Sequence, residues 1–324
     1  MPRLDLPLAE LWDLREDLPE PPGIDRFWEH TLAEAAGVPL GVRVERVETP
    51  LVAVESYGVT YAGFGGSPVR AWLHLPAAAV RGPDPLTGVV QFQGYNGGRG
   101  LVHEHTFWAT AGFAHLVMDT RGQGSGWSTG HTPDPAPAGP SQGGFLTRGI
   151  ERPEDHFYRR VFVDAVRAVS VLRERPEVDP GRIVVTGHSQ GGGISLAVAA
   201  LADGVAAVMP DVPFLCHFRR AVELTATDPY AEVARYLGAH RDRVDQVFAT
   251  LAHFDAAVLA RRASVPALFS VAMMDSLCLP STVFAAYHSY AGPKEIVVHE
   301  FNDHEGGGPF QQRRQLDWLR ETLG

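Results

Sequence analysis

Cysteine is scarce in this sequence, with two residues, Cys216 and Cys278, in a chain of 324. Two cysteines cannot build the disulfide framework of a small secreted domain, and their separation matches no metal-ligand spacing. We therefore expect each of them to be a buried thiol in a protein of a reducing compartment.

Clusters of positive charge and long apolar runs are also missing. The formal net charge is -10, and Lys and Arg gather nowhere, so the chain offers no attractive field to a phosphate backbone or an anionic membrane. No apolar run is long enough to span a bilayer, and the first residues lack the basic segment and apolar stretch of a signal peptide. The sequence predicts a cytoplasmic protein that binds neither nucleic acid nor membrane.

The composition is that of an ordinary globular protein, with 45% hydrophobic and 20% charged residues. No internal repeat occurs, and we predict a single large α/β domain over residues 1–324. Residues 1–39 are predicted to form an arm and a helix, with Asp25 as the helix N-cap. From Val42 to Leu75, alternating β-branched and aromatic residues predict antiparallel strands.

The pattern changes after this antiparallel start. Short apolar runs such as G-V-V-Q-F-Q-G and F-A-H-L-V-M-D-T end in glycine or polar loops, as strands of a mostly parallel, buried sheet do. A crossover helix is expected from His103 to Ala111, and the prolines of residues 132–140 predict a surface loop. Residues 214–262 have helical patterns without strands, which predicts a helical insertion over the carboxyl-terminal edge of the sheet.

The strongest local signal is G-H-S-Q-G from Gly187 to Gly191, which stands between a β-branched strand and a helical run. Small residues on both sides would let Ser189 occupy a strained turn that exposes its Oγ at the start of the helix, as in a nucleophile elbow. The alternative is a plain glycine-rich turn between strand and helix. We predict that Ser189 is a nucleophile.

A serine nucleophile needs a base and an orienting carboxylate, which in the α/β-hydrolase fold follow in the order serine, acid, histidine. Asp275 ends the apolar strand P-A-L-F-S-V-A-M-M, and His304 lies in the loop N-D-H-E-G-G after the last strand. Both would lie at the carboxyl edge of the sheet, so we predict Asp275 as the acid and His304 as the base. Rivals for the acid are Asp211, which also follows a strand, Asp255 and Asp303.

Acyl transfer also needs hydrogen-bond donors aimed at the developing oxyanion. One is expected to be the backbone N–H of Gln190, the residue after the nucleophile. The second should come from G-Y-N-G-G after the strand Val89–Gln93, where lipases carry H-G-G-G, and the Tyr95 N–H is the candidate. The alternative for this loop is a plain glycine turn.

Three further motifs carry weaker signals. His103, Glu104 and His105 could be metal ligands, but a solvated helix start explains them better. H-E-F-N-D-H has one residue too many for the H-E-x-x-H zinc helix, so no metal is predicted. R-G-Q-G-S-G, which begins at Arg121, lacks the G-K-[ST] ending of a nucleotide-binding loop, so no cofactor is predicted. Arg121 is instead expected to pair with a carboxylate or with carbonyl groups beneath the site.

Taken together, these segments resemble the acetyl xylan esterase and cephalosporin C deacetylase family, carbohydrate esterase family 7. The shared segments are the arm L-D-L-P-L-A-E-L, the G-Y-N-G-G loop, R-G-Q-G-S, G-H-S-Q-G-G-G, M-M-D-S-L-C-L-P-S-T-V-F-A-A-Y, A-G-P-K-E-I and N-D-H-E-G-G. The likeness covers nearly the whole chain, and R-G-Q, G-x-S-Q-G and H-E in this order are highly specific. Leu279 and His288 depart from the family pattern near the acid loop, which leaves the acyl and alcohol preference open.

The resemblance implies Ser189 as nucleophile, His304 as base and Asp275 as orienting acid. It also implies that the backbone N–H groups of Tyr95 and Gln190 bind the oxyanion. The implied enzyme removes acetyl groups from small acetylated sugars, such as xylo-oligosaccharides, and from cephalosporin C-like compounds through an acetyl-serine intermediate. The implied assembly is a ring-like homohexamer whose active sites face a shared interior.

Fold and catalytic residues alone do not choose the acyl group. A longer-chain carboxylesterase or a peptidase on the same fold therefore stays open as an alternative. A catalytically silent binding protein with this fold is the alternative from another functional class.

Overall fold

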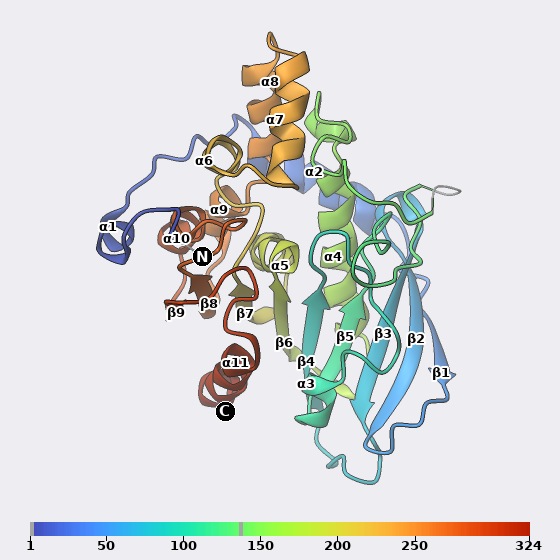
Figure 1. Ribbon diagram of the computed structural model, residues 1–324. Helices are drawn as coiled ribbons and strands as arrows, with labels where there is room; N and C mark the ends of the chain where they lie inside the picture. The colour runs from blue at the N-terminus through green and yellow to red at the C-terminus, as the bar shows by residue number, and fades with distance from the viewer. Residues whose placement is uncertain (1–2, 136–138) are drawn as a thin grey trace.

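The computed structural model of the chain describes residues 3–135 and 139–324 (Figure 1). Its strands are β1 (Arg43–Val47), β2 (Val54–Ala62), β3 (Pro68–Pro76), β4 (Leu86–Phe92), β5 (Ala114–Met118), β6 (Val178–His188), β7 (Val205–Asp211), β8 (Ala267–Ala272) and β9 (Lys294–His299). In the described ranges these nine strands form one sheet, in the order β1-β2-β3-β5-β4-β6-β7-β8-β9. The pairs from β1 to β3, and the pair of β3 with β5, are antiparallel, whereas the neighbours from β5 to β9 are parallel. This arrangement confirms the predicted antiparallel start and the mostly parallel sheet.

Helices cover both faces of this sheet (Figure 1). They are α1 (Leu8–Asp13), α2 (Ile24–Ala36), α3 (Phe107–Thr110), α4 (Phe157–Arg173), α5 (Gln190–Leu201), α6 (Phe218–Leu224), α7 (Tyr230–Ala239), α8 (Val244–Ala252), α9 (Ala256–Leu259), α10 (Pro280–Ser289) and α11 (Gly308–Leu323). Short 3-10 turns occur at Phe64–Gly66, Pro153–Asp155 and Ala260–Arg262. None of the helices in the described ranges is both long enough and apolar enough to cross a membrane.

The central strands are buried on both sides, which explains their continuous apolar runs. Val90 and Val185 pack in a large core with residues of α2, α4, α5 and α10. Their neighbours Val89 and Val184 point to the opposite face and pack in a smaller core with residues of α3 and α11. Successive side chains of a strand point to opposite faces, so the sheet supports two helical layers at once.

Two local predictions are wrong. The helix expected from His103 to Ala111 is limited to α3, because the preceding residues form a loop in which the Gly100 N–H bonds to the Thr129 carbonyl. The predicted N-cap Asp25 lies inside the first turn of α2, one residue after its start. Gly23 takes the N-cap position in a left-handed conformation, with φ 78°, which glycine adopts without a steric penalty.

The structure describes every residue from 214 to 262. This segment contains α6, α7, α8, α9 and the last 3-10 turn, and it contains no strand. In Figure 1 the helices α6, α7 and α8 gather beyond the end of the sheet at which β6 leads into α5. Of the predicted loop over 132–140, residues 132–135 and 139–140 lie in neither helix nor strand, and 136–138 are outside the described residues.

Candidate active site

The carboxyl ends of neighbouring parallel strands bring the candidate residues together. Phe92 of β4 pairs with Gly187 of β6, and His188 of β6 pairs with Asp211 of β7. Asp211 in turn pairs with Ser270 of β8. The loops that follow β4, β6 and β8 therefore begin side by side at one edge of the sheet, and these loops hold Tyr95, Ser189 and Asp275 respectively.

Ser189 occupies a sharp turn between β6 and α5. Its φ of 56° and ψ of -118° are unfavourable for a residue with a side chain, and such strain is typical of functional turns. The turn depends on close backbone approach, because a Cβ on Gly187 would lie 2.6 Å from the Gly191 Cα, and one on Gly191 would collide with the Phe92 carbonyl oxygen. The Ser189 N–H donates to the Asp211 carbonyl over 2.9 Å, which fixes the turn against β7.

Asp275 and His304 form a hydrogen-bonded pair. His304 Nδ1 lies 2.9 Å from Asp275 Oδ2, and the Asp275 side chain is fully buried. The second carboxylate oxygen, Oδ1, accepts the backbone N–H groups of Leu277 and Cys278, both over 2.8 Å. Since a carboxylate can only accept, the proton of the His304–Asp275 bond is on Nδ1, which leaves Nε2 as an acceptor in the neutral ring.

The environment of His304 favours its protonated form. Burial lowers the pKa of this histidine, but the hydrogen bond and the negative charge of Asp275 outweigh burial. The charges of Asp303 and Asp211 act in the same direction, so the pKa of His304 is raised above 6.5. The ring is therefore basic enough to take up a proton near neutral pH.

A cavity of about 470 Å³ opens beside Ser189 and His304. Its lining residues are Gly94, Tyr95, Asn96, Trp127, His188, Ser189, Asp228, Pro229, Leu277, His304 and Glu305. Within the described chain no hydrogen bond joins Ser189 to His304, and the Ser189 Oγ lies 3.9 Å from the Cys278 Sγ. Such bonds are often long in enzymes without substrate and shorten when the substrate binds, so both side chains remain available to one ligand.

The two predicted oxyanion donors lie close to the nucleophile. Gln190 is the first residue of α5, where backbone N–H groups have no partner within the helix. In the part of the chain that the structure describes, the Tyr95 N–H donates to no protein acceptor. The Gln190 side chain holds the loops in place: its amide N–H donates to the Gln93 carbonyl over 3.0 Å, and its amide oxygen accepts from Gln123 Nε2 over 2.9 Å and from the Tyr158 hydroxyl over 2.7 Å.

Arg121 forms an entirely buried ion pair. Its guanidinium bonds to both oxygens of Asp164 over 2.6 and 2.7 Å and to Asp134 over 3.2 Å. Of the two predicted kinds of partner, carboxylate or carbonyl, the carboxylate is confirmed. Asp164 also accepts the Phe64 N–H, so this pair ties the R-G-Q loop to α4 and to the turn after β2.

Donor atoms of Asp275, Cys278 and His304 lie within 4.8 Å of one another, a spacing that a metal ion could use. The carboxylate already accepts bonds from His304 and from two backbone N–H groups, and burial, together with the charge of Asp275, raises the pKa of the Cys278 thiol. A protonated thiol is a poor ligand, so the donor set fits a hydrogen-bonded acid–base pair better than a metal centre. The rival acid Asp211 accepts a hydrogen bond from the Ser270 hydroxyl instead of one from His304.

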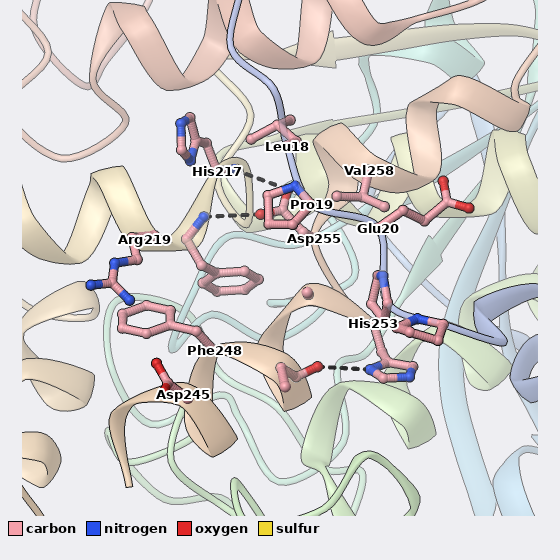
Figure 2. A pocket seen from close by; sticks show the side chains of 15 residues that line it. Leu18, Pro19, Glu20, His217, Arg219, Asp245, Phe248, His253, Asp255 and Val258 are labelled. Atoms are coloured by element: carbon pink, nitrogen blue, oxygen red, sulfur yellow. Dashed lines mark hydrogen bonds between the residues drawn. The ribbon is translucent and has the colours of Figure 1, made fainter. Parts of the chain in front are cut away.

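A second cavity, of about 400 Å³, lies between residues 18–22 and the helices α6 and α8 (Figure 2). One of its polar groups, the Asp255 carboxylate, accepts the backbone N–H groups of His217 and Phe218, each over 2.9 Å. No serine, threonine or cysteine is among its lining residues, all of which are described. It therefore offers no hydroxyl or thiol nucleophile, and the cavity beside Ser189 is the candidate active site.

Sequence reasoning did not find three residues close to the site. Trp127 follows the R-G-Q-G-S-G motif and donates its Nε1–H to the Tyr95 carbonyl over 2.8 Å. Cys278 was expected to be buried, as was Cys216, and both are buried free thiols, but its contact with Ser189 was not foreseen. Glu232 of α7 accepts a hydrogen bond from the Tyr95 hydroxyl, and no local pattern in the sequence marks it.

Comparisons with known proteins agree on one family. The family described as acetyl xylan esterase (AXE1) matches residues 1–322. The acetyl xylan esterase from Paenibacillus sp. R4 is 36% identical, with a TM-score of 0.90 over 98% of this chain and 100% of that chain. The acetyl xylan esterase 1 from Thermoanaerobacterium sp. JW/SL YS485 is 30% identical, with a TM-score of 0.88 over 99% of this chain and 100% of that chain.

More distant matches are an acetyl esterase and a peptidase of the same fold. Acetyl esterase Axe7A of Xylanibacter ruminicola is 25% identical over 319 residues, which are 94% of this chain and 67% of that protein. Pyrococcus horikoshii acylaminoacyl peptidase, at 15% identity and a TM-score of 0.56 over 88% of this chain and 41% of that chain, shares the fold alone. The family resemblance expected from the sequence is thus confirmed: the chain belongs to the acetyl xylan esterase family and is an esterase of the α/β-hydrolase fold.

Proposed function

We propose that this esterase hydrolyses acetyl esters of small acetylated sugars, such as xylo-oligosaccharides, through an acetyl-serine intermediate on Ser189. The observation that carries the proposal is that Ser189 and His304 line one cavity. Asp275 Oδ2 lies 2.9 Å from His304 Nδ1 and so leaves the other ring nitrogen, Nε2, free to act as a base. The names of the two similar solved structures, both acetyl xylan esterases, support the acetyl group and the sugar.

In the first step, His304 Nε2 takes the proton of the Ser189 hydroxyl while Oγ forms a bond to the acetyl carbonyl carbon. The carbonyl oxygen becomes an oxyanion, which the backbone N–H groups of Tyr95 and Gln190 stabilise. The bond from carbon to the sugar oxygen then breaks, and the sugar leaves with the proton from His304. The product of this step is an acetyl ester of Ser189.

In the second step, water replaces the sugar. His304 takes a proton from the water molecule, whose oxygen attacks the acetyl carbon, and the same two N–H groups stabilise the second oxyanion. The bond to Ser189 Oγ breaks, and the proton on His304 returns to the serine oxygen. Acetate leaves, and the enzyme is restored.

The test is acetate release by the Ser189→Ala variant. Loss of a serine nucleophile typically lowers kcat by on the order of a million-fold, and the fold should survive because only one oxygen atom is removed. A folded variant that retained substantial esterase activity would refute the proposed mechanism. Rates on acetyl, butyryl and octanoyl esters of one alcohol separate the acetylesterase from a longer-chain carboxylesterase, which would prefer the longer acyl groups.

Two finer expectations belong to the same proposal. Cephalosporin C-like compounds carry an acetyl ester on a small alcohol, so the same steps would release acetate from them. The ring-like homohexamer is what the family resemblance implies, and exposed apolar side chains such as Phe301 at 77% and Phe310 at 84% are compatible with contacts between chains.

A further inference from the structure

A buried carboxylate without a cationic partner lies beside the candidate site. Glu232, in the first turn of α7, is 7% exposed, and among the described residues no Lys, Arg or His forms an ion pair with it. Its two oxygens accept hydrogen bonds from the Tyr95 hydroxyl, over 2.8 and 2.9 Å, and from the backbone N–H groups of Gly144, over 2.8 Å, and Leu146, over 3.2 Å. A charge that is removed from water without an opposite charge is costly, so only this set of donors makes the position tolerable.

Glu232 bonds to Tyr95, the residue whose N–H is proposed to bind the oxyanion. The Tyr95 hydroxyl also accepts the Phe145 N–H over 2.9 Å, so it donates one hydrogen bond and accepts another, and both hold the ring in place. The Tyr95 carbonyl accepts Trp127 Nε1–H over 2.8 Å, and the next residue, Asn96, donates its N–H to Gln123 over 2.8 Å. The ring, the carbonyl group and the following amide are therefore all fixed, whereas the Tyr95 N–H is left for a ligand.

The protonation state of the phenol agrees with this arrangement. Burial, and then the adjacent negative charge of Glu232, raise the pKa of Tyr95. The hydroxyl therefore stays protonated at neutral pH, and it remains a donor to the carboxylate.

We propose that Glu232 is a positioning residue of the oxyanion hole, which orients the Tyr95 N–H by holding the Tyr95 side chain against helix α7 and residues 144–146. The inference rests on the proposed function, because it needs Tyr95 to bind the oxyanion. Glu232 does not line the cavity beside Ser189, and its hydrogen bonds in the described chain go to Tyr95 and to residues 144 and 146, so we assign its effect on the reaction to Tyr95. A donor stabilises the transition state only if it is already in place when charge develops, so an anchor on Tyr95 affects the chemical step.

The sharpest variant is Glu232→Gln, which keeps the size of the side chain and replaces one acceptor oxygen by an NH2 group. In the variant, the NH2 group would face a donor, either the Tyr95 hydroxyl or one of the backbone N–H groups that now bond to the Glu232 carboxylate. The hydrogen bonds that hold Tyr95 would therefore weaken. We expect kcat for a soluble acetyl ester to fall by roughly ten- to a hundredfold, since misplaced or missing oxyanion donors cost about that or more, with KM changed by less than about twofold. A boronic acid, whose tetrahedral adduct with Ser189 places an oxygen in the oxyanion hole, should bind more weakly by a similar factor.

Two further variants complete the experiment. Tyr95→Phe removes the same hydrogen bond from the other side, so it should show a comparable loss of kcat, and the double variant should lose little more. Tyr236→Phe is the matched control, because its hydroxyl lies on the same helix but bonds to Glu151 over 3.3 Å, and wild-type kcat is expected. Thermal unfolding of each variant separates loss of stability from loss of rate.

The outcomes distinguish the inference from the proposed function. Wild-type kcat and boronic acid affinity in Glu232→Gln, or a rise in KM alone, would overturn the positioning role and leave the Ser189 mechanism standing. Esterase activity in Ser189→Ala would instead remove the mechanism itself. Should Glu232→Gln fail to fold, Tyr95→Phe decides the matter, because a wild-type kcat in that variant contradicts the inference equally.

Discussion

His304 Nδ1 lies 2.9 Å from Asp275 Oδ2, and this bond determines which ring nitrogen of His304 can act as a base. The carboxylate fixes the proton on Nδ1, so Nε2 carries the lone pair. Two backbone N–H groups hold the same carboxylate from its other oxygen, which keeps it in one orientation. In the proposed mechanism, Asp275 therefore acts on the reaction through the tautomer and the orientation of His304.

Asp275→Asn should cripple the enzyme without unfolding it. The amide can present an NH2 group to Nδ1, which favours the wrong tautomer, and loss of the equivalent carboxylate in a serine protease lowers kcat by about ten-thousand-fold. The measurement is kcat for acetate release, with Asp211→Asn as the control, since Asp211 bonds to Ser270 rather than to His304. If Asp211→Asn proved the crippling change and Asp275→Asn the mild one, the assignment of the acid would be wrong.

The pH dependence of kcat/KM should report His304. The base must be neutral to accept the serine proton, and its pKa is raised above 6.5, so activity should fall as the pH drops through a midpoint above 6.5. In Asp275→Asn, the hydrogen bond and the charge that raise this pKa are lost while burial, which lowers it, remains. The residual activity of the variant should therefore have its midpoint at lower pH, in profiles measured from about pH 5 to about pH 9. An unchanged midpoint would show that another group controls the acidic limb.

Much of this site is predictable from sequence because it depends on local backbone chemistry. The glycines around Ser189 are needed at close backbone approaches, and such requirements leave a fixed spacing in the chain. The acid and the base each follow an apolar strand, and parallel strands bring their carboxyl ends to one edge regardless of their distance along the chain. The placement of Ser189, Asp275 and His304 around one edge follows from these two facts.

Other features have no local signal because they arise where distant segments meet. Glu232 lies in an ordinary amphipathic helix, and its burial depends on how α7 packs over the loop that contains Tyr95. The helix expected from His103 to Ala111 was too long, because the segment before α3 is a loop in which the N–H groups of Gly98 and Gly100 bond to the carbonyls of residues 128 and 129. Helical periodicity over His103 to Ala111 does not reveal that competing pairing.

A pair of buried histidines should make the protein sensitive to acid. His74 of β3 and His115 of β5 are register partners, with ring centroids 6.1 Å apart, and within the described chain both nitrogens of His115 lack a hydrogen-bond partner. Burial lowers the pKa of His74 to about 4 and that of His115 well below 6.5. Both histidines have a lower pKa in the folded protein than in the unfolded chain, so acid favours the unfolded chain, which takes up protons first. The free energy of unfolding is therefore unaffected by these histidines above pH 6.5 and decreases as the pH falls toward 4, by about 3 kcal/mol for His74.

The variant that tests this is His115→Leu, which removes one proton-binding group and breaks no hydrogen bond among the described residues. Its Tm should decline less steeply than that of the wild type as the pH falls from 6.5 toward 4, the range bounded by the unfolded and folded pKa of His74. Identical slopes for wild type and His115→Leu would contradict the role of the buried pair.

The last prediction concerns assembly and substrate size. If the chain forms a ring-like homohexamer whose active sites face a shared interior, entry is limited by the channel into the ring rather than by the cavity of about 470 Å³ beside Ser189. Acetylated xylose and short acetylated xylo-oligosaccharides should then be hydrolysed well. Polymeric acetylated xylan should be a poor substrate, because a long chain cannot bring its inner acetyl groups to Ser189.

Light scattering and acetate release test this together. The scattering mass should correspond to six chains of 35.2 kDa, and the rate on short substrates should exceed the rate on polymer when both contain the same acetyl concentration. The polymer should become a better substrate after it has been cut by a xylanase, because shorter pieces can enter. A monomer, or equal rates on intact and cut polymer, would defeat the enclosed-ring proposal, whereas the Ser189 chemistry does not depend on either result.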